Sequence, residues 1–124
     1  MGADLAITAG STGTTQLDNF NDVVMAKMEL PGDGGKWVLM GRVYLSNFDG
    51  DPQWVTATLL HDRNVVIDQV RLWIPGEEYR QCFYLQAGFV ANGKETVTLE
   101  CNTWKGEADN GSLIAIKVDN IDFQ

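Results

Sequence analysis

The most constraining feature of this chain is a series of short runs rich in Val, Ile, Leu, Thr and aromatic residues, each closed by Gly, Pro, Asn or Asp. Branched and aromatic side chains favour β-strands, and the closing residues adopt the backbone angles that turns require. No run has the period of an amphipathic helix. We predict strands at 23–30, 36–46, 53–61, 65–74, 78–90, 95–102 and 112–121, with a further short strand before Phe20.

The segments between these runs have the composition of tight turns. Asn, Asp, Gly and Pro dominate residues 31–35, 47–52, 62–64, 75–76, 92–93 and 109–111. Gly and Asn tolerate positive φ, and Pro presets the φ of a turn. Connections this short join antiparallel strands or cross between two sheets, because a parallel crossover needs about a dozen residues or more.

Alternation of side chains along three runs assigns them to two faces, one toward the core and the other wetter. The opposing sets are Trp37, Leu39, Gly41, Val43 and Leu45 against Val38, Met40, Arg42 and Tyr44; Val97, Leu99 and Cys101 against Thr96, Thr98, Glu100 and Asn102; and Ile114, Ile116 and Val118 against Ala115, Lys117 and Asp119. Such strands, with no helices to cover them, predict an all-β fold. We expect an antiparallel two-sheet β-sandwich of jelly-roll (Greek-key) topology with about seven or eight strands.

The chain length of 124 residues fits one domain, and a chain of this size buries roughly two thirds of its extended surface on folding. Residues 2–19 are rich in Gly, Ala, Ser and Thr, and their only large apolar side chains are Leu5, Ile7 and Leu17. Such a segment buries too little apolar surface to become ordered by itself. We therefore predict a flexible or docking N-terminal arm at 1–19 and a β-sandwich domain at 20–124.

Two of the predicted strands are apolar on both faces. In 36–46 the outer set includes Val38, Met40 and Tyr44, and in 65–74 both sets carry large apolar side chains. A two-layer sandwich covers only one face of each sheet, so the second apolar face has to meet another subunit, a ligand or the arm. We expect a homo-oligomer with Val38, Met40 and Tyr44 at the subunit interface.

The charge and hydropathy of the chain argue against several classes of partner. Seventeen acidic against nine basic residues give a formal net charge of −8, which repels a phosphate backbone, so we expect no nucleic acid partner. No stretch of about 18 apolar residues is present, and the first ten residues lack the basic and apolar parts of a secretory signal. We expect a soluble chain without membrane insertion.

The inventory of catalytic side chains is short. His61 is the single histidine, which argues against the multi-histidine metal sites of some jelly-roll proteins and leaves little for a nucleophile–base pair. Its place at the end of the 53–61 run favours an ordinary polar strand end. Glycoside hydrolysis uses a pair of carboxylates. An acidic chain places such pairs on its surface by chance, so they give little support to a glycosidase. We expect a protein without enzymatic activity.

The segment around Asp49 and Asp51 has the oxygen-rich composition of a calcium loop, as does the segment 109–111, and neither matches an EF-hand. The same residue types also form turns that hold no metal, and the bare turn is the interpretation that we favour. Calcium at Asp49 and Asp51 is the one metal site that we predict, and no other cofactor is expected.

Tryptophans at the strand ends point to a sugar site. Trp54 and Trp104 fall where loops cluster, so their rings can stack on a sugar while Asn102 binds hydroxyl groups. Packing at the edge of the sandwich is the competing interpretation. Trp37 and Trp73 lie within apolar runs, and we expect them in the core or at a subunit interface.

Cys82 and Cys101 fall in neighbouring runs, and a disulfide between them is one interpretation. Cys101 shares a face with Val97 and Leu99, whereas Cys82 belongs to the less apolar set of its run, so simple strand pairing puts the two thiols on different faces. We favour two free thiols, as in a protein that folds in a reducing cytoplasm.

Four segments resemble small bacterial jelly-roll domains of the tumour necrosis factor-like or complement globular-head-like kind. They are the Leu-Pro-Gly step at 30–32, the Val-Tyr-Leu-Ser-Asn strand end at 43–47, the strand at 96–101 and the closing strand at 112–119. The likeness consists of strand patterns and includes no catalytic signature, so it implies a fold more than a function.

This resemblance implies a trimer that works as a structural protein on a particle or fibre, such as a phage decoration, tail or receptor-binding protein. The partners expected on this basis are a capsid, a tail or a cell-surface glycan, in a virion or extracellular particle assembled in the cytoplasm. The first 19 residues are too short and irregular for a collagen-like stalk, which leaves the arm as a clamp onto a neighbour. The alternative function is that of a carbohydrate-binding module with an exposed Trp54 or Trp104.

Overall fold

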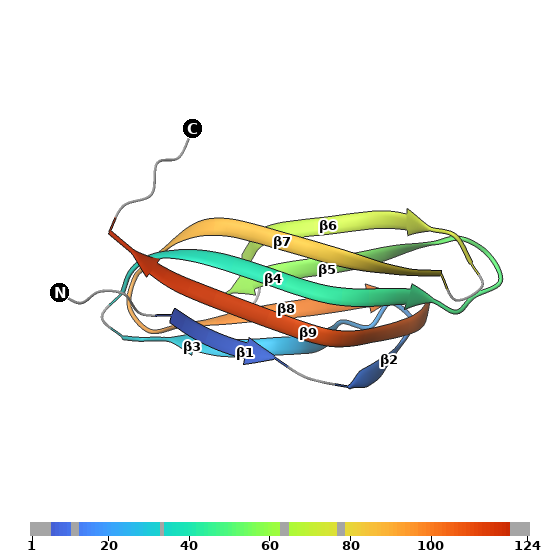
Figure 1. Ribbon diagram of the computed structural model, residues 1–124, viewed down its shortest axis with the longest axis horizontal. Helices are drawn as coiled ribbons and strands as arrows, with labels where there is room; N and C mark the ends of the chain where they lie inside the picture. Colours follow the sequence, from blue (N-terminus) through green and yellow to red (C-terminus); the bar gives the residue numbers. More distant parts are fainter. Residues whose placement is uncertain (1–5, 11–12, 33, 63–64, 77–78, 120–124) are drawn as a thin grey trace.

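The computed structural model describes residues 6–10, 13–32, 34–62, 65–76 and 79–119, which form an all-β fold (Figure 1). No helix occurs within these ranges. The strands are β1 (Ala6–Gly10), β2 (Thr14–Asp18), β3 (Val23–Leu30), β4 (Gly35–Asn47), β5 (Gln53–His61), β6 (Val65–Ile74), β7 (Tyr79–Ala91), β8 (Glu95–Thr103) and β9 (Lys105–Val118). The predicted all-β class with two antiparallel sheets is confirmed, and β3, β5 and β6 have the predicted bounds.

Two antiparallel sheets build the sandwich. Sheet A has the order β1–β9–β4–β7, with β2 also paired to β9, and sheet B has the order β3–β8–β5–β6. Figure 1 shows β4, β7 and β9 side by side in one layer, with β5 and β8 in the layer behind. The pairs β5–β6, β4–β7 and β3–β8 are nested inside the pairing of β9 with the N-terminal strands, as expected when a long hairpin is wound into a jelly roll.

The core between the sheets follows the predicted alternation. Trp37, Leu39, Val43 and Leu45 point inward from β4, Leu99 points inward from β8, and all five have 0% exposure. Removing a large apolar side chain from water stabilises the fold by roughly 1.5–3 kcal/mol. Both sheets contribute such side chains to one cluster, so the core fixes the position of one sheet relative to the other.

The last strand is longer than predicted. The turn that we expected at 109–111 and the strand start at 112 are wrong, because β9 runs unbroken from Lys105 to Val118; residue 121, the predicted end, lies outside the described residues. Asn110 takes the positive φ of 51°. Asn, Asp and Gly serve a β-bulge as readily as a turn, so composition alone does not separate the two.

Register shows where the extra residue of β9 lies. As β4 advances two residues from Arg42 to Tyr44, β9 moves three residues from Ser112 to Asp109. After the bulge the inward side chains of β9 are Leu113 and Ala115. The bulkier Ile114 and Ile116 therefore lie on the outer face of sheet A.

Residues of the predicted N-terminal arm form β1 and β2, which pair with β9 of the same chain. β1 pairs with residues 112–116 and β2 with residues 105–109, so the change of partner falls at the bulge. Leu17 of β2 is 1% exposed and belongs to the core. The division into an arm and a domain stays a prediction, and residues 1–5 lie outside the described chain.

Candidate functional site

The outer face of sheet A carries apolar side chains in register across its two central strands. Val38 on β4 is opposite Ile116 on β9, and Met40 is opposite Ile114. Val38, Met40 and Ile114 are half-buried, and Ile116 is 37% exposed. Cross-strand neighbours keep apolar surface contiguous, so these four residues form a patch rather than scattered single side chains. We call them the apolar stripe.

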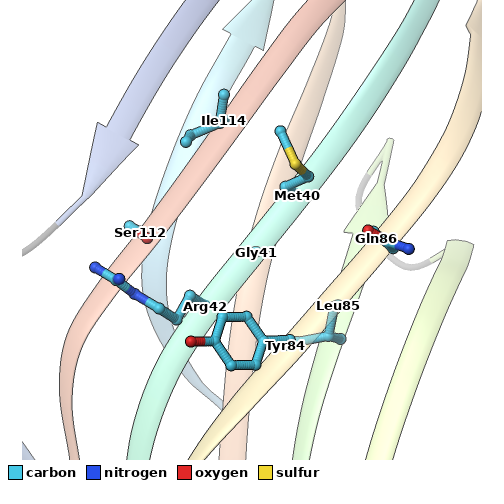
Figure 2. Close-up of a pocket in the computed structure, with 8 residues that line it drawn as sticks. All are labelled: Met40, Gly41, Arg42, Tyr84, Leu85, Gln86, Ser112 and Ile114. Atoms are coloured by element: carbon cyan, nitrogen blue, oxygen red, sulfur yellow. The ribbon is translucent and has the colours of Figure 1, made fainter.

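A hollow of about 270 Å³ adjoins the apolar stripe on the side of β7. Figure 2 shows Met40 and Ile114 toward one end of it and Arg42 and Tyr84 side by side toward the other. Gln86 and Ser112 complete its polar lining. A hollow with apolar and polar ends suits the side chains of a protein partner.

Tyr44, the third predicted interface residue, lies at a polar end of the same face. The guanidinium of Arg80 lies 4.4 Å from the centroid of the Tyr44 ring, and Arg42 lies 5.8 Å from it. Arg80 Nη2 also forms an ion pair with Asp109 Oδ1 at 3.0 Å. The structure thus places Val38 and Met40 together and surrounds Tyr44 with charge.

Sequence reasoning missed the contribution of Ile114 and Ile116 to this face. The alternation of 112–118 separated them from Ala115 and Lys117, but it did not show which set points outward. That choice depends on the bulge at Asn110, which resets the phase of β9 relative to its first half. The sequence therefore showed that Ile114 and Ile116 share a face, but it did not show that this face points away from the core.

Both cysteines are free, which is the interpretation that we favoured. Cys82 lies on β7 of sheet A and Cys101 lies on β8 of sheet B. Cys82 is half-buried on the outer face of sheet A, opposite Tyr44. A side-chain hydrogen bond with Cys82 is the main cause that raises the pKa of Tyr84. Cys101 points into the core, and burial raises the pKa of its thiol to about 12.

A second candidate site lies on the outer face of sheet B. Trp54 on β5 and Trp73 on β6 are direct strand partners, and their rings meet edge to face with centroids 5.1 Å apart. Trp54 is 41% exposed and Trp73 is 56% exposed. Arg71 places its guanidinium 4.6 Å from the centroid of Trp54. We expected Trp73 in the core or at an interface; within this chain it is a surface residue, whereas Trp37 is fully buried in the core.

Trp104 lines a separate hollow of about 350 Å³, together with Gln16, Asp18 and Lys105. Its ring lies 6.0 Å from that of Phe20. Phe20 has a positive φ of 56°, which is a strained conformation for a bulky side chain. The predicted sugar residue Trp104 is therefore exposed, at 49%, beside a concave surface.

Asn102, the third predicted sugar ligand, is half-buried between these two places. Its side-chain Nδ2 donates to Asp22 Oδ1 at 2.7 Å. Thr103 Oγ1 donates to the carbonyl of Trp54 at 2.9 Å, which joins the ends of β5 and β8. Trp54 and Trp104 therefore lie at the same end of the sandwich, while Asn102 is engaged with a carboxylate.

The loop with Asp49 and Asp51 is organised by a buried amide. The Asn47 Nδ2 group donates to the carbonyls of Asp51, Ile74 and Pro75 at 3.0–3.1 Å, and Asn47 Oδ1 accepts from the backbone N–H of Asp49 at 2.8 Å. Sequence reasoning placed Asn47 in the turn, in the calcium-like segment and at a strand end, and it did not predict this buried network. The predicted calcium site at Asp49 and Asp51 stays a prediction.

Gln53 extends this buried network to the start of β9. Its Nε2 donates to Asn47 Oδ1 and to the carbonyl of Lys105, and its Oε1 accepts from the Lys105 N–H at 3.1 Å. The two amides therefore join the β4–β5 loop, the β6–β7 loop and the β8–β9 corner. This network positions the aromatic end of the molecule.

His61 stands at the end of β5, as predicted. Its ring lies 4.5 Å from that of Phe89, and its Nδ1 lies 3.8 Å from Glu95 Oε2, with neither of these two atoms hydrogen-bonded. Across the described ranges, no three His, Cys, Asp or Glu side chains gather to hold a metal ion. The part of the chain that the structure describes also lacks any helix able to cross a membrane.

No protein-family model matches this sequence, and no curated protein matches it. Among solved structures, it is similar to a chain of the infectious bursal disease virus Gx strain, with 10% identity and a TM-score of 0.57, and to one of the T13 IBDV viral particle, with 9% and 0.56. It is also similar to dimeric latent PorU from Porphyromonas gingivalis, with 11% identity and a TM-score of 0.61.

These three alignments cover 94%, 92% and 94% of this chain but only 33%, 31% and 13% of the other chains, so it spans a third or less of each. At such identities the likeness shows the fold alone, which viral and bacterial chains share. The finer resemblance to the tumour necrosis factor-like group has no family match behind it and stays a prediction.

Proposed function

We propose that this chain is a non-catalytic binding and assembly module that forms a homo-oligomer through the outer face of sheet A. The apolar stripe carries this proposal, because Val38, Met40, Ile114 and Ile116 lie in register at the centre of the sheet. Burying apolar surface against a second copy stabilises the assembly by about 25 cal/mol per Å² removed from water. The adjoining hollow beside Tyr84 receives side chains of the partner copy.

The role that we propose is structural, on a particle or fibre. The similarity to chains of infectious bursal disease virus supports a virion setting, and the resemblance of the strand pattern to trimeric jelly rolls supports three copies. A phage decoration, tail or receptor-binding protein combines these features. The acidic surface opposes assembly by charge repulsion, so we expect salt to tighten the oligomer.

Solution mass by light scattering tests the proposal. The full chain should be oligomeric, and Met40→Asp should shift it to a monomer because a charge replaces apolar surface at the interface. Val66→Asp is the matched control: Val66 is 53% exposed on β6 of sheet B and belongs neither to the apolar stripe nor to the lining of the hollow, so its substitution should leave the mass unchanged. A monomer at all concentrations and salt levels would contradict the proposal.

A second candidate function is carbohydrate binding at the hollow beside Trp104. It is favoured by an exposed indole next to polar groups of Gln16, Asp18 and Lys105, which is the composition of a sugar site. Trp104→Ala should then abolish retention on a glycan column without changing the solution mass. Retention that survives Trp104→Ala would remove this candidate.

A further inference from the structure

Among the arginines that lie over aromatic rings in the described residues, Arg71 and Arg80 come closest to a ring centroid, and these two differ in one respect. Arg80 lies 4.4 Å from the centroid of Tyr44 and is paired with Asp109 at 3.0 Å. Arg71 lies 4.6 Å from the centroid of Trp54, but no carboxylate pairs with it among the residues that the structure describes. Arg71 is therefore a guanidinium that lies against an aromatic ring and has no ion pair within the described residues, which leaves it able to bind an anion.

The acid nearest to Arg71 along β6 is already engaged. Asp68 Oδ1 accepts from the N–H of Gln69 at 2.9 Å, and its Oδ2 accepts from the N–H of Gln86 at 3.0 Å. The carboxylate of Asp68 thus binds backbone groups of β6 and β7. The guanidinium of Arg71 keeps its own donors for a ligand.

Trp73 supplies a stacking surface next to this cation. Its ring meets that of Trp54 in an edge-type contact and is 56% exposed, and no cation lies over it in the described chain, whereas Arg71 covers Trp54. β6 is the last strand of sheet B, so the aromatic pair lies at an edge of that sheet. A ring-shaped ligand can stack on Trp73 while the rest of its chain extends beyond the sandwich.

The charges of sheet B favour one orientation of an anion. Glu100 and Asp22 lie toward β3, on the opposite side of the sheet from β6, and Asp22 acts on Glu100 as a like charge that helps burial to raise the pKa of its carboxyl. An anionic group is repelled from that side and attracted by Arg71 at the β6 edge.

We propose that Trp73, Trp54 and Arg71 form a binding site for a carboxylate-bearing pyranose, the terminal or repeating unit of an acidic glycan. The apolar face of the sugar stacks on Trp73, and Arg71 donates paired hydrogen bonds to the carboxylate. This site lies on the opposite sheet from the apolar stripe and is distinct from the hollow beside Trp104. The test of this site is therefore independent of the test of assembly.

Titration of the full chain with 3′-sialyllactose and trigalacturonate, against lactose as the neutral probe, tests this site. Binding is followed by calorimetry and by the indole N–H signals of the four tryptophans in nuclear magnetic resonance spectra. An acidic sugar should bind about tenfold more tightly than lactose and should move the signals of Trp54 and Trp73, because a charge-assisted hydrogen-bond pair is added.

Three variants assign the roles of the residues. Trp73→Ala should weaken binding of the acidic sugars by about tenfold or more, since it removes the stacking surface. Arg71→Gln should bring the acidic sugars down to the affinity of lactose, and Arg71→Lys should restore part of the preference because it returns the charge without the planar fork. Val24→Ala is the control, because Val24 is 51% exposed on β3 at the opposite edge of sheet B, and it should change nothing. Melting temperatures confirm that each variant is folded.

Several outcomes would overturn the site. Equal affinity for acidic and neutral sugars, an acidic preference that survives Arg71→Gln, or loss of binding in Val24→Ala would each contradict the assignment. A fall in solution mass on Trp73→Ala would identify the aromatic pair as a contact between copies. Binding of neither trigalacturonate nor sialyllactose by the folded protein would also refute it.

Discussion

The outer faces of the two sheets differ in how their apolar residues are arranged. On sheet A, the apolar stripe runs through the centre of the face, on strands that are flanked on both sides. On sheet B, the central outward positions are Thr56, Thr58 and Glu100, and the large rings of Trp54 and Trp73 lie together at one end. A central apolar patch is best covered by another protein surface, whereas an aromatic corner beside one cation fits a small ligand.

The largest expected effect comes from removing the support that both faces share. Asn47→Ala deletes a fully buried amide with five hydrogen bonds and leaves carbonyl and N–H groups unpaired. We expect the free energy of unfolding in urea to fall by about 3 kcal/mol.

Asn92→Ala, in the exposed turn after β7, is the control and should change stability by less than about 0.5 kcal/mol. When Asn47→Ala unfolds in urea, it should lose self-association and sugar binding over the same range of urea concentration. Unchanged stability of Asn47→Ala would show that the network does not hold the loops.

An exchange of variants separates the two faces. Met40→Asp should weaken self-association by about a hundredfold and leave affinity for a monovalent acidic sugar within about twofold, because the two sites share no residue. Trp73→Ala should do the opposite. Analytical ultracentrifugation and calorimetry on the same samples measure both properties, and a variant that affects both equally would merge the two faces into one functional surface.

The two thiols report on the faces independently. Cys82 lies on the outer face of sheet A, while burial holds the pKa of Cys101 at about 12, so only one thiol should react with a maleimide in the folded protein near neutral pH. If sheet A is covered in the oligomer, the reaction of Cys82 should be about tenfold faster in Met40→Asp than in the parent chain. Equal labelling rates would place the interface elsewhere.

The smallest effect concerns the acidic side of sheet B. Burial, followed by the charge of Asp22, raises the pKa of Glu100 above its ordinary value of 4.5. The folded state therefore binds this proton more tightly than the unfolded chain, and the resulting stability is present below pH 4.5 and is lost as pH rises through the raised pKa.

Glu100→Gln should consequently stabilise the protein at pH 7 by only about a few tenths of a kcal/mol, because the side chain is only partly buried and solvent screens its charge. The gain should disappear in acid, as thermal melting between pH 4 and pH 8 will show. Glu29→Gln, in the exposed pair with Lys94, is the control and should give no gain at neutral pH. A gain from Glu100→Gln that persists in acid would contradict the assigned cause.

Local sequence rules recovered most strands and the outward positions of residues that depend on one strand. Val38 and Met40 were assigned to an outer face because alternation along β4 is uninterrupted, and the exposed positions of Trp54 and Trp104 followed from their places at strand ends. The rules failed at Asn110, where turn residues form a bulge. They also missed the role of Asn47, since its partners at Ile74 and Pro75 are 27 and 28 residues away.

The sequence alone determined the all-β class, the alternation of the strands and the acidic surface, because these depend on residue type and on neighbours within a few positions. Only the tertiary structure decided that Ile114 lies beside Met40, that Trp73 meets Trp54 and that Arg71 has no acid partner within the described residues. Those contacts depend on strand order and register. Order and register are set by packing of the whole core, which joins segments that are far apart along the chain.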